Sequence, residues 1–189
     1  LLLILISLGI GLQIVLYKIA FIALLLLWMF DGDLINKIKK VKKNKRALVL
    51  SGLYLFYLFS IIWTENYAFG ISDLILKSPL FFLPLIFSST NFLNRNIINN
   101  VLLVFAFSSV FINLYCLIIA GINYSEELGI NTFYYHNLTI NMHSAYQSMF
   151  TCFSISIFFY RRSIFMHSHN ISFHFLVFIQ LIFVLLLTS

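Results

Sequence analysis

The chain has 189 residues, of which 61% are hydrophobic and 10% are charged, and its twelve basic and six acidic residues give a formal net charge of +6. Soluble domains contain about 45–50% apolar and about 25% charged residues. With a mean hydropathy of +0.98, the chain is excluded from that class, because a small soluble domain cannot bury so much apolar surface. We predict an all-α, polytopic transmembrane helix bundle with about six to seven spans.

Both ends of the chain lie in apolar sequence. The first residues are LLLILISLGIG, without an initiator Met, and the last are LIFVLLLTS. A cleaved signal peptide does not explain the start, since no basic n-region or small-residue cleavage site is visible. We therefore expect residues 1–189 to be a single transmembrane domain, truncated at the C-terminus and at the N-terminus. Cys116 and Cys152 lie inside apolar runs, and we interpret them as small buried residues.

Candidate spans are judged against the roughly 20 apolar residues that a membrane-crossing helix requires. The first segment is too long for one span and carries Lys18 near its middle. A lysine at that depth is costly unless it pairs or reaches the interface, so we favour a hairpin of two short helices over one tilted helix. Two other segments are short and are expected to borrow flanking residues. The candidates are 1–30, 47–63, 78–90, 99–120, 146–160 and 171–188.

The basic residues predict the orientation. The loop DGDLINKIKKVKKNKR, 31–46, holds seven of the twelve Lys and Arg residues, and the positive-inside rule makes it cytoplasmic. A nucleic-acid patch is the rival interpretation, but a basic run between two apolar spans favours topology, and we predict no nucleic-acid partner. Counting spans places 64–77 and 121–145 outside, and 91–98 and 161–170 inside. The other charges agree: Glu126 and Glu127 fall outside, while Arg95, Arg161, Arg162, His167 and His169 fall inside.

The stretch after Trp63 combines charges with both prolines of the chain. Trp63 is expected at the outer interface, where indole rings favour the headgroup level. Residues 64–77 are predicted to form an amphipathic helix on the outer membrane surface, with Asp73 and Lys77 paired four residues apart. The chain is then expected to turn inward at Ser78–Pro79 and to kink or break at Pro84. The alternative is a plain interfacial helix whose ion pair only aids solubility. The predicted apolar face holds Ala68, Ile71, Leu74, Ile75 and Ser78.

The outer loop 123–148 contains a second concentration of polar residues, including Tyr135, His136, His143 and Tyr146. Histidine is the usual acid–base group near neutral pH, and tyrosine suits sugar recognition by stacking and hydrogen bonding. If 136–146 is helical, the two histidines share one face. The alternative is a set of interfacial polar residues without a catalytic role.

Motifs for metals and cofactors are not found. The loop lacks the H-E-x-x-H spacing of zinc enzymes, and we interpret MHSHNISFH, with His167, His169 and His174, as a solvated basic turn. The sequence has no phosphate-binding glycine loop, nucleotide fingerprint, Ser–His–Asp arrangement or CxxC motif. We therefore predict no metal and no cofactor.

The order of these parts resembles the O-antigen ligase-like family, which includes O-antigen ligases and Wzy-type polysaccharide polymerases. A span ends in W-T-E-N at 63–66, and an amphipathic stretch runs into K-S-P-L-F-F-L-P at 77–84. A later outer segment has the pattern H-x-x-x…Y, here H-N-L-T-I-N-M-H-S-A-Y at 136–146, although Ser144 and Ala145 stand where related sequences often have a proline before the tyrosine. The closing L-L-L-T-S, 185–189, is similar to the end of a family span.

The resemblance implies a GT-C-like fold and an inverting, metal-independent glycan transfer at the outer face of the bacterial inner (cytoplasmic) membrane. The donor would be an undecaprenyl-diphosphate-linked glycan, and the acceptor would be lipid A–core or a growing glycan chain. Membrane lipids are the other expected partners. Glu65 and His136 would be the candidate catalytic residues. Lys77 would neutralise the diphosphate, and Tyr135, His143 and Tyr146 would bind substrate. The family's large outer loop would follow Ser189, so we expect this stretch to be inactive alone.

Two other functions remain open. A multi-spanning transporter or flippase for lipid-linked glycan would show paired, Gly/Pro-broken helices near mid-membrane, whereas here one segment carries both prolines and the polar residues gather at the predicted outer face. A non-catalytic membrane anchor or sensor would carry a soluble domain. The polar outer segments favour the transferase.

Overall fold

The computed structural model describes residues 1–189 apart from 13–14, 91–93, 125–128, 141, 162–170 and 189, and the side chains of 171–173 and 188 are likewise outside the description. Within this part of the chain every regular element is a helix, which confirms the all-α prediction. Part of the predicted orientation rests on residues outside the described ones, namely Glu126, Glu127, Arg162, His167 and His169.

Three helices are long and apolar enough to cross a membrane: Lys45–Trp63, Tyr67–Ser89 and Arg95–Ile122. The number rises to four if the bent pair Leu16–Phe30 and Leu34–Lys43 is one broken span. The chain is therefore a membrane protein by the length and composition of its helices. The six to seven predicted spans are not confirmed, because the other apolar helices of the described residues are shorter.

The chain divides into two compact units, each described here by itself. Residues Phe21–Ile97 form the hairpin unit, and Leu1–Ala20 together with Ile98–Ser189 form the bundle unit. The predicted segment 1–30 contains two helices, α1 (Leu2–Gly11) and α2 (Leu16–Phe30), rather than one tilted helix. Lys18 consequently lies in the first turn of α2, with Nζ 5.9 Å from the centre of the Tyr17 ring.

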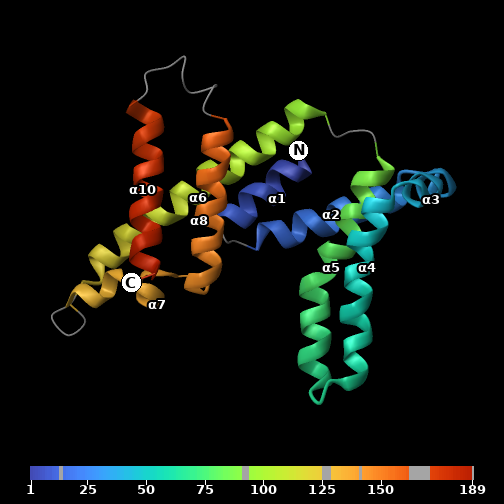
Figure 1. The fold of residues 1–189 in the computed structure, drawn as a ribbon, viewed down its shortest axis with the longest axis horizontal. Coiled ribbons are helices and arrows are strands. Elements are labelled where there is room, and N and C mark those ends of the chain that lie inside the picture. The colour runs from blue at the N-terminus through green and yellow to red at the C-terminus, as the bar shows by residue number, and fades with distance from the viewer. Residues whose placement is uncertain (13–14, 91–93, 125–128, 141, 162–170, 189) are drawn as a thin grey trace. The chain divides into compact units, whose positions relative to one another are not determined.

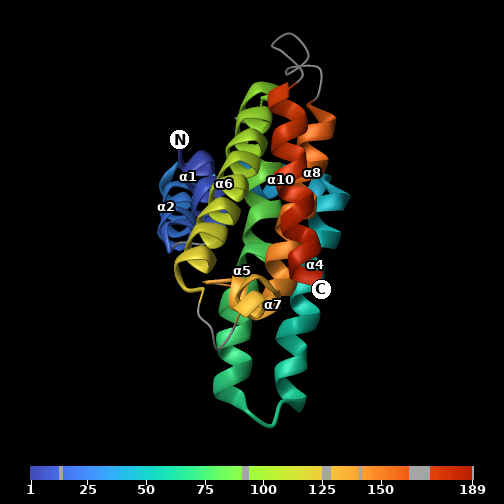
Figure 2. The same cartoon turned by 90° about the vertical axis from the view of Figure 1, so that its left-hand side faces the viewer.

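The hairpin unit takes its name from two antiparallel helices that lie side by side (Figures 1 and 2). These are α4 (Lys45–Ser60), continued by the 3-10 turn η1 (Ile61–Trp63), and α5 (Tyr67–Ser89). Hydroxyl groups of α4 donate to backbone carbonyls of α5: Ser51 Oγ to Phe81 over 3.1 Å and Tyr54 to Leu74 over 3.2 Å. Most large apolar side chains of this pair point outward, as expected where lipid is the solvent.

Helix α5 continues through both prolines, so the predicted inward turn at Ser78–Pro79 is wrong, and of the predicted kink or break at Pro84 the break does not occur. A proline lacks the N–H that would bond the carbonyl four residues earlier. For Pro79 that carbonyl belongs to Ile75, and the Ser78 hydroxyl donates to it over 2.8 Å. Hydroxyl side chains commonly satisfy such carbonyls in membrane helices. The 23 residues of α5 extend about 34 Å, enough for a hydrocarbon core of about 30 Å.

The predicted basic loop 31–46 instead contains a helix, α3 (Leu34–Lys43), which meets α2 at an angle of 107°. Lys37 holds this corner, although its side chain is only 8% exposed. Its Nζ donates to the carbonyl oxygens of Trp28 (2.6 Å) and Asp31 (3.3 Å) and lies 3.5 Å from Asp31 Oδ2. A cation at these free carbonyls complements the negative end of the α2 dipole. Lys37 therefore fixes where α2 ends and α3 begins.

The bundle unit is built from α6 (Arg95–Ile122), α8 (Ser144–Tyr160) and α10 (Ile171–Thr188). Helices α8 and α10 are antiparallel, and α6 slants across them (Figures 1 and 2). Helix α1 packs on α6 so closely that a Cβ at Gly11 would clash with Ser108 Oγ, so a glycine is required there. Cys116 is buried as predicted, whereas Cys152 is exposed, which corrects the prediction for Cys152.

Candidate functional site

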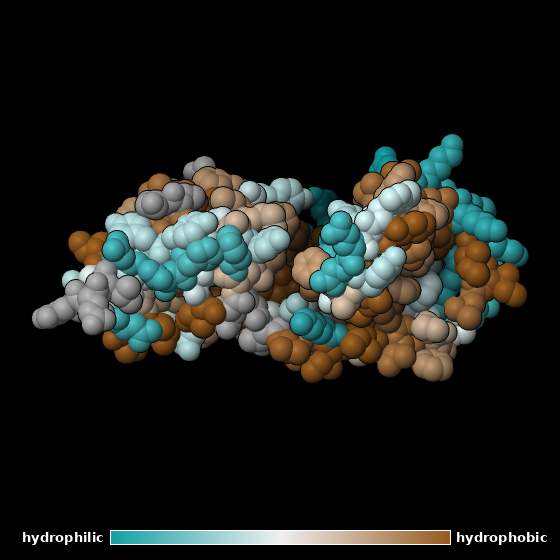
Figure 3. Space-filling view, turned by 90° about the horizontal axis from the view of Figure 1, so that it is seen from below, coloured by the Kyte–Doolittle hydropathy of each residue, from teal (hydrophilic) through white to brown (hydrophobic). Residues whose placement is uncertain are grey.

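The four residues predicted for the outer loop come together at one end of the bundle unit. Tyr135 and His136 belong to the single-turn helix α7 (Tyr135–Leu138), while His143 and Tyr146 lie at the start of α8. Ring centroids are 4.3 Å apart for His136 and His143, 4.2 Å for Tyr135 and His136, and 6.3 Å for His143 and Tyr146. We call these residues the His–Tyr cluster. All four side chains are exposed, and Figure 3 shows hydrophilic residues gathered between hydrophobic ones at this end.

The segment that carries Tyr135 and His136 is anchored by the side chain of Leu138. Leu138 is 1% exposed and packs in a hydrophobic cluster with Cys116 and Phe183. Tyr135 has a φ of +50°, a left-handed conformation that is rare for a bulky aromatic residue. Such conformations persist only where surrounding structure holds them, and they concentrate at functional sites. The anchored turn therefore presents the two rings in a fixed arrangement.

His143 and His136 are held differently. His143 caps α8, because its Nδ1 accepts a hydrogen bond of 3.2 Å from the Ala145 N–H. This contact leaves Nε2 to face a ligand. The His136 side chain has ring contacts with Tyr135 and His143 and no hydrogen bond among the described residues. His136 is thus the imidazole with both nitrogens available for proton transfer.

The predicted helix over 136–146 does not form as one element, since α7 ends at Leu138 and α8 begins at Ser144. The contact between the histidine rings therefore joins two separate elements. No group of three His, Cys, Asp or Glu side chains with metal-binding geometry occurs among the described residues. His174 is exposed on α10, and its neighbours His167 and His169 lie outside the described residues.

Lys77 and Asp73 form the predicted ion pair, but their position differs from the prediction. Lys77 is the eleventh of the 23 residues of α5, about 15 Å from the start of the helix. Its Nζ binds Asp73 Oδ2 and lies 4.1 Å from the centre of the Tyr57 ring on α4. The predicted surface helix over 64–77 is therefore wrong, and the ion pair lies halfway along a membrane-length helix.

The polar side of α5 faces its partner helix. Lys77 lies over the Tyr57 ring of α4, whereas Ile71 and Ile75 of the predicted apolar face are exposed. In water the apolar face would be buried. In lipid the charged groups gain by meeting another helix, which explains the reversed arrangement.

Glu65 lies in the exposed turn between η1 and α5. The length of α5 between this turn and Lys77 separates the two residues, so the structure does not bring these predicted site residues together. Both belong to the hairpin unit, and the His–Tyr cluster belongs to the bundle unit. The six predicted site residues therefore form one cluster of four and two isolated positions.

A buried polar network in the bundle unit was not predicted. Asn113 of α6 donates to Thr151 Oγ1 (3.0 Å) of α8 and to Gln180 Oε1 (2.7 Å) of α10, and it accepts from Gln147 Nε2 (3.1 Å). All four side chains are at most 1% exposed. None of these side chains carries a charge, and their hydrogen bonds join three helices. The available signal was a set of polar residues inside apolar runs, with Gln147 and Thr151 four apart.

Comparison with protein-family models, curated proteins and solved structures finds no match for this chain. The resemblance to the O-antigen ligase-like family therefore stays a prediction from the sequence motifs.

Proposed function

We propose that this chain is the membrane-embedded part of a cell-envelope glycan transferase. It would move a glycan from an undecaprenyl-diphosphate carrier onto lipid A–core or a growing glycan chain. The observation that supports this function is the His–Tyr cluster, in which two imidazoles and two phenol rings are exposed within 6.3 Å of a neighbour. Aromatic faces suit sugar rings, and imidazole suits proton transfer from a hydroxyl group.

Under this proposal each residue of the His–Tyr cluster has a role. His136 removes the proton from the acceptor hydroxyl as its oxygen attacks the anomeric carbon, and the carrier diphosphate leaves with the electron pair of the broken bond. His143, fixed by its capping bond, donates from Nε2 to the glycan. Tyr135 and Tyr146 stack on sugar rings on either side. The proposal includes no metal and no cofactor.

The hairpin unit supplies two further proposed residues. Glu65, exposed in the turn before α5, is a second candidate base. Lys77 would contact the diphosphate, and it would have to exchange Asp73 for that anion. We place the whole protein in the bacterial inner membrane as a multi-pass, GT-C-like enzyme with six to seven spans over residues 1–189.

A transporter or flippase for lipid-linked glycan is the second candidate. One observation favours it: the Asp73–Lys77 pair lies halfway along a membrane-length helix, and ionisable groups at that depth often mark a substrate or ion path. The two functions differ in where the lipid-linked donor accumulates when the protein fails.

The test uses the full-length protein in cells that lack it, with surface glycan and carrier-linked glycan both measured. His136→Ala should lower transfer about 100-fold or more, as expected for loss of a general base, with carrier-linked glycan accumulating at the outer face. The matched control His174→Ala should leave transfer unchanged. Tyr146→Phe should keep more activity than Tyr146→Ala, because the ring survives. Accumulation at the cytoplasmic face would support the flippase, and normal transfer by His136→Ala would refute the assigned role.

A further inference from the structure

Two adjoining pockets lie at the corner between α2 and α3, both within the hairpin unit. One, of about 420 Å³, is lined by the apolar side chains of Leu24, Leu27, Trp28, Phe30 and Ile86. The other, of about 370 Å³, is lined by Asp33, Asn36, Lys37, Lys40 and Ser89. Asp31 and Thr90 line both. We call these the apolar pocket and the polar pocket, and each falls in the range of about 300–1,000 Å³ typical of small-molecule sites.

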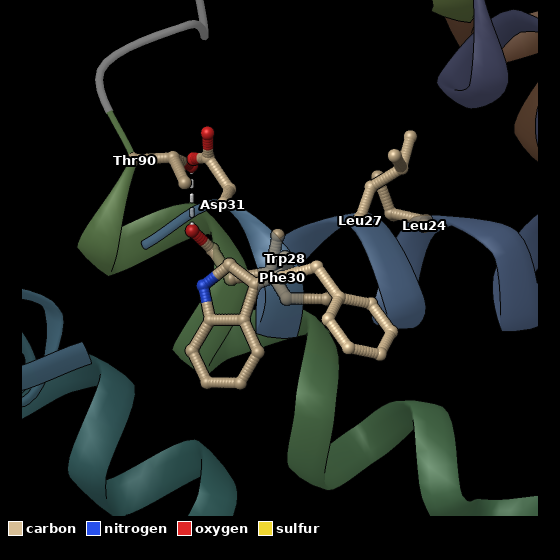
Figure 4. Close-up of a pocket in the computed structure, with 7 residues that line it drawn as sticks. Leu24, Leu27, Trp28, Phe30, Asp31 and Thr90 are labelled. Carbon is tan, nitrogen blue, oxygen red and sulfur yellow. Dashed lines mark hydrogen bonds between the residues drawn. The ribbon is translucent and has the colours of Figure 1, made fainter. Parts of the chain in front are cut away.

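The shared residues mark where the character of the lining changes. Figure 4 shows Asp31 and Thr90 side by side at one edge of the apolar pocket, with the Trp28 ring beneath them and Leu24 and Leu27 at the opposite side. Trp28 is fixed by a hydrogen bond of 2.8 Å from Nε1 to Ser89 Oγ. An occupant of both pockets would need a polar group joined to an apolar chain.

The surroundings place this corner at a membrane surface. Helix α3 exposes Leu34, Ile35 and Ile38, and its lysines at 39, 40, 42 and 43 are exposed as well. An amphipathic helix of this kind lies in the plane of the interface, and the 107° angle to α2 fits that orientation. The mouth of the polar pocket is then at the level of lipid headgroups.

The charges in the polar pocket select the headgroup. Lys37 is occupied by Asp31 and by carbonyl oxygens of α2. The Asp33 side chain makes no capping bond to α3, and the side chains of Asp33 and Lys40 have no ion pair or hydrogen bond with the described residues. One carboxylate and one ammonium group thus line the same pocket without a counter-charge. A headgroup that carries both a phosphate and a primary ammonium complements them.

We propose that the two pockets bind one aminophospholipid of the phosphatidylethanolamine type. Its phosphate pairs with Lys40, its ammonium group donates to Asp33 and to the oxygens of Asp31 and Thr90, and the start of an acyl chain fills the apolar pocket. A choline headgroup lacks the N–H donors that these acceptors need, and a glycerol headgroup lacks the cation.

The test uses the purified full-length protein, stripped of lipid and incubated in detergent with equal amounts of phosphatidylethanolamine, phosphatidylcholine and phosphatidylglycerol of the same acyl chains. Lipids that remain bound after re-isolation are quantified by mass spectrometry. Phosphatidylethanolamine should be enriched. Asp33→Asn, which tolerates the left-handed backbone at this position, and Lys40→Gln should each lower that enrichment about tenfold, the effect of losing a charged hydrogen bond.

The matched control is Lys43→Gln, which removes the same charge from α3 outside the pocket and should leave the enrichment unchanged. Circular dichroism confirms that each variant is folded. Preferential binding of phosphatidylglycerol, equal binding of all three lipids, or an equal loss in Lys43→Gln and Lys40→Gln would each overturn the proposal in favour of a general basic surface.

Discussion

The ion pair between Asp73 and Lys77 permits a test of where α5 lies. In the structure Lys77 is the eleventh of 23 helical residues and contacts both Asp73 and the Tyr57 ring. A lone charge at the centre of a membrane helix costs about 2.5–3.5 kcal/mol. Lys77→Met removes the cation that pairs with Asp73, and Asp73→Leu removes the carboxylate that pairs with Lys77. Each single substitution should therefore destabilise the protein by about 2–3 kcal/mol.

The double variant Asp73→Leu/Lys77→Met removes both charges and should be more stable than either single variant. Reversible unfolding in mixed micelles, followed by circular dichroism, measures all four proteins. Tyr57→Phe is the matched control, since it keeps the ring under Lys77 and should cost less than about 0.5 kcal/mol. An ion pair on an aqueous surface is worth about 1 kcal/mol or less. Single variants that each lose less than that, with an additive double variant, would refute the position inside a membrane-crossing hairpin.

Three further predictions concern the packing of the helices. Asn113→Ala removes three hydrogen bonds between helices and should destabilise the bundle by about 2 kcal/mol in the same unfolding assay, while the exposed Asn100→Ala on α6 should change little. Lys37→Met should cost about 1.5–3 kcal/mol, because the end of α2 loses its cation, and tryptophan fluorescence should report the change. Ser78→Ala should destabilise the native sequence by about 1 kcal/mol. In the Pro79→Ala background the same change should cost almost nothing, because the alanine N–H then bonds the Ile75 carbonyl. Equal costs in both backgrounds would contradict the assigned role of Ser78.

The His–Tyr cluster shows which parts of the site the sequence could predict. Residue chemistry was enough to select Tyr135, His136, His143 and Tyr146, because imidazole and phenol groups are concentrated in one polar loop. The assumed helix was wrong, and the contact between the rings joins two separate helices, of which α7 is anchored by the buried Leu138. Spacing along a loop does not contain that information.

The interpretation of 64–84 failed for a different reason. The prediction placed the charged side chains at the outer membrane surface and took the prolines as points where the helix turns, kinks or breaks. In the structure the Ser78 hydroxyl group donates to the carbonyl that Pro79 leaves free, and Lys77 lies over the Tyr57 ring of the neighbouring helix α4. Helix α3 was missed because seven basic residues dominated the interpretation of 31–46, although Leu34, Ile38 and Val41 recur at helical spacing.

The most direct measurement of the proposed function is photo-crosslinking of the full-length protein to an undecaprenyl-diphosphate-linked glycan in proteoliposomes. A photoreactive residue replaces Tyr146 in the His–Tyr cluster or, as the matched control, Tyr160, which is also exposed but lies at the other end of α8. Our account predicts a crosslink to the glycan from position 146, and a large reduction when unlabelled lipid-linked glycan competes, with no such product from position 160. Equal crosslinking from both positions, or none from position 146, would contradict the assignment of the cluster as a glycan-binding site.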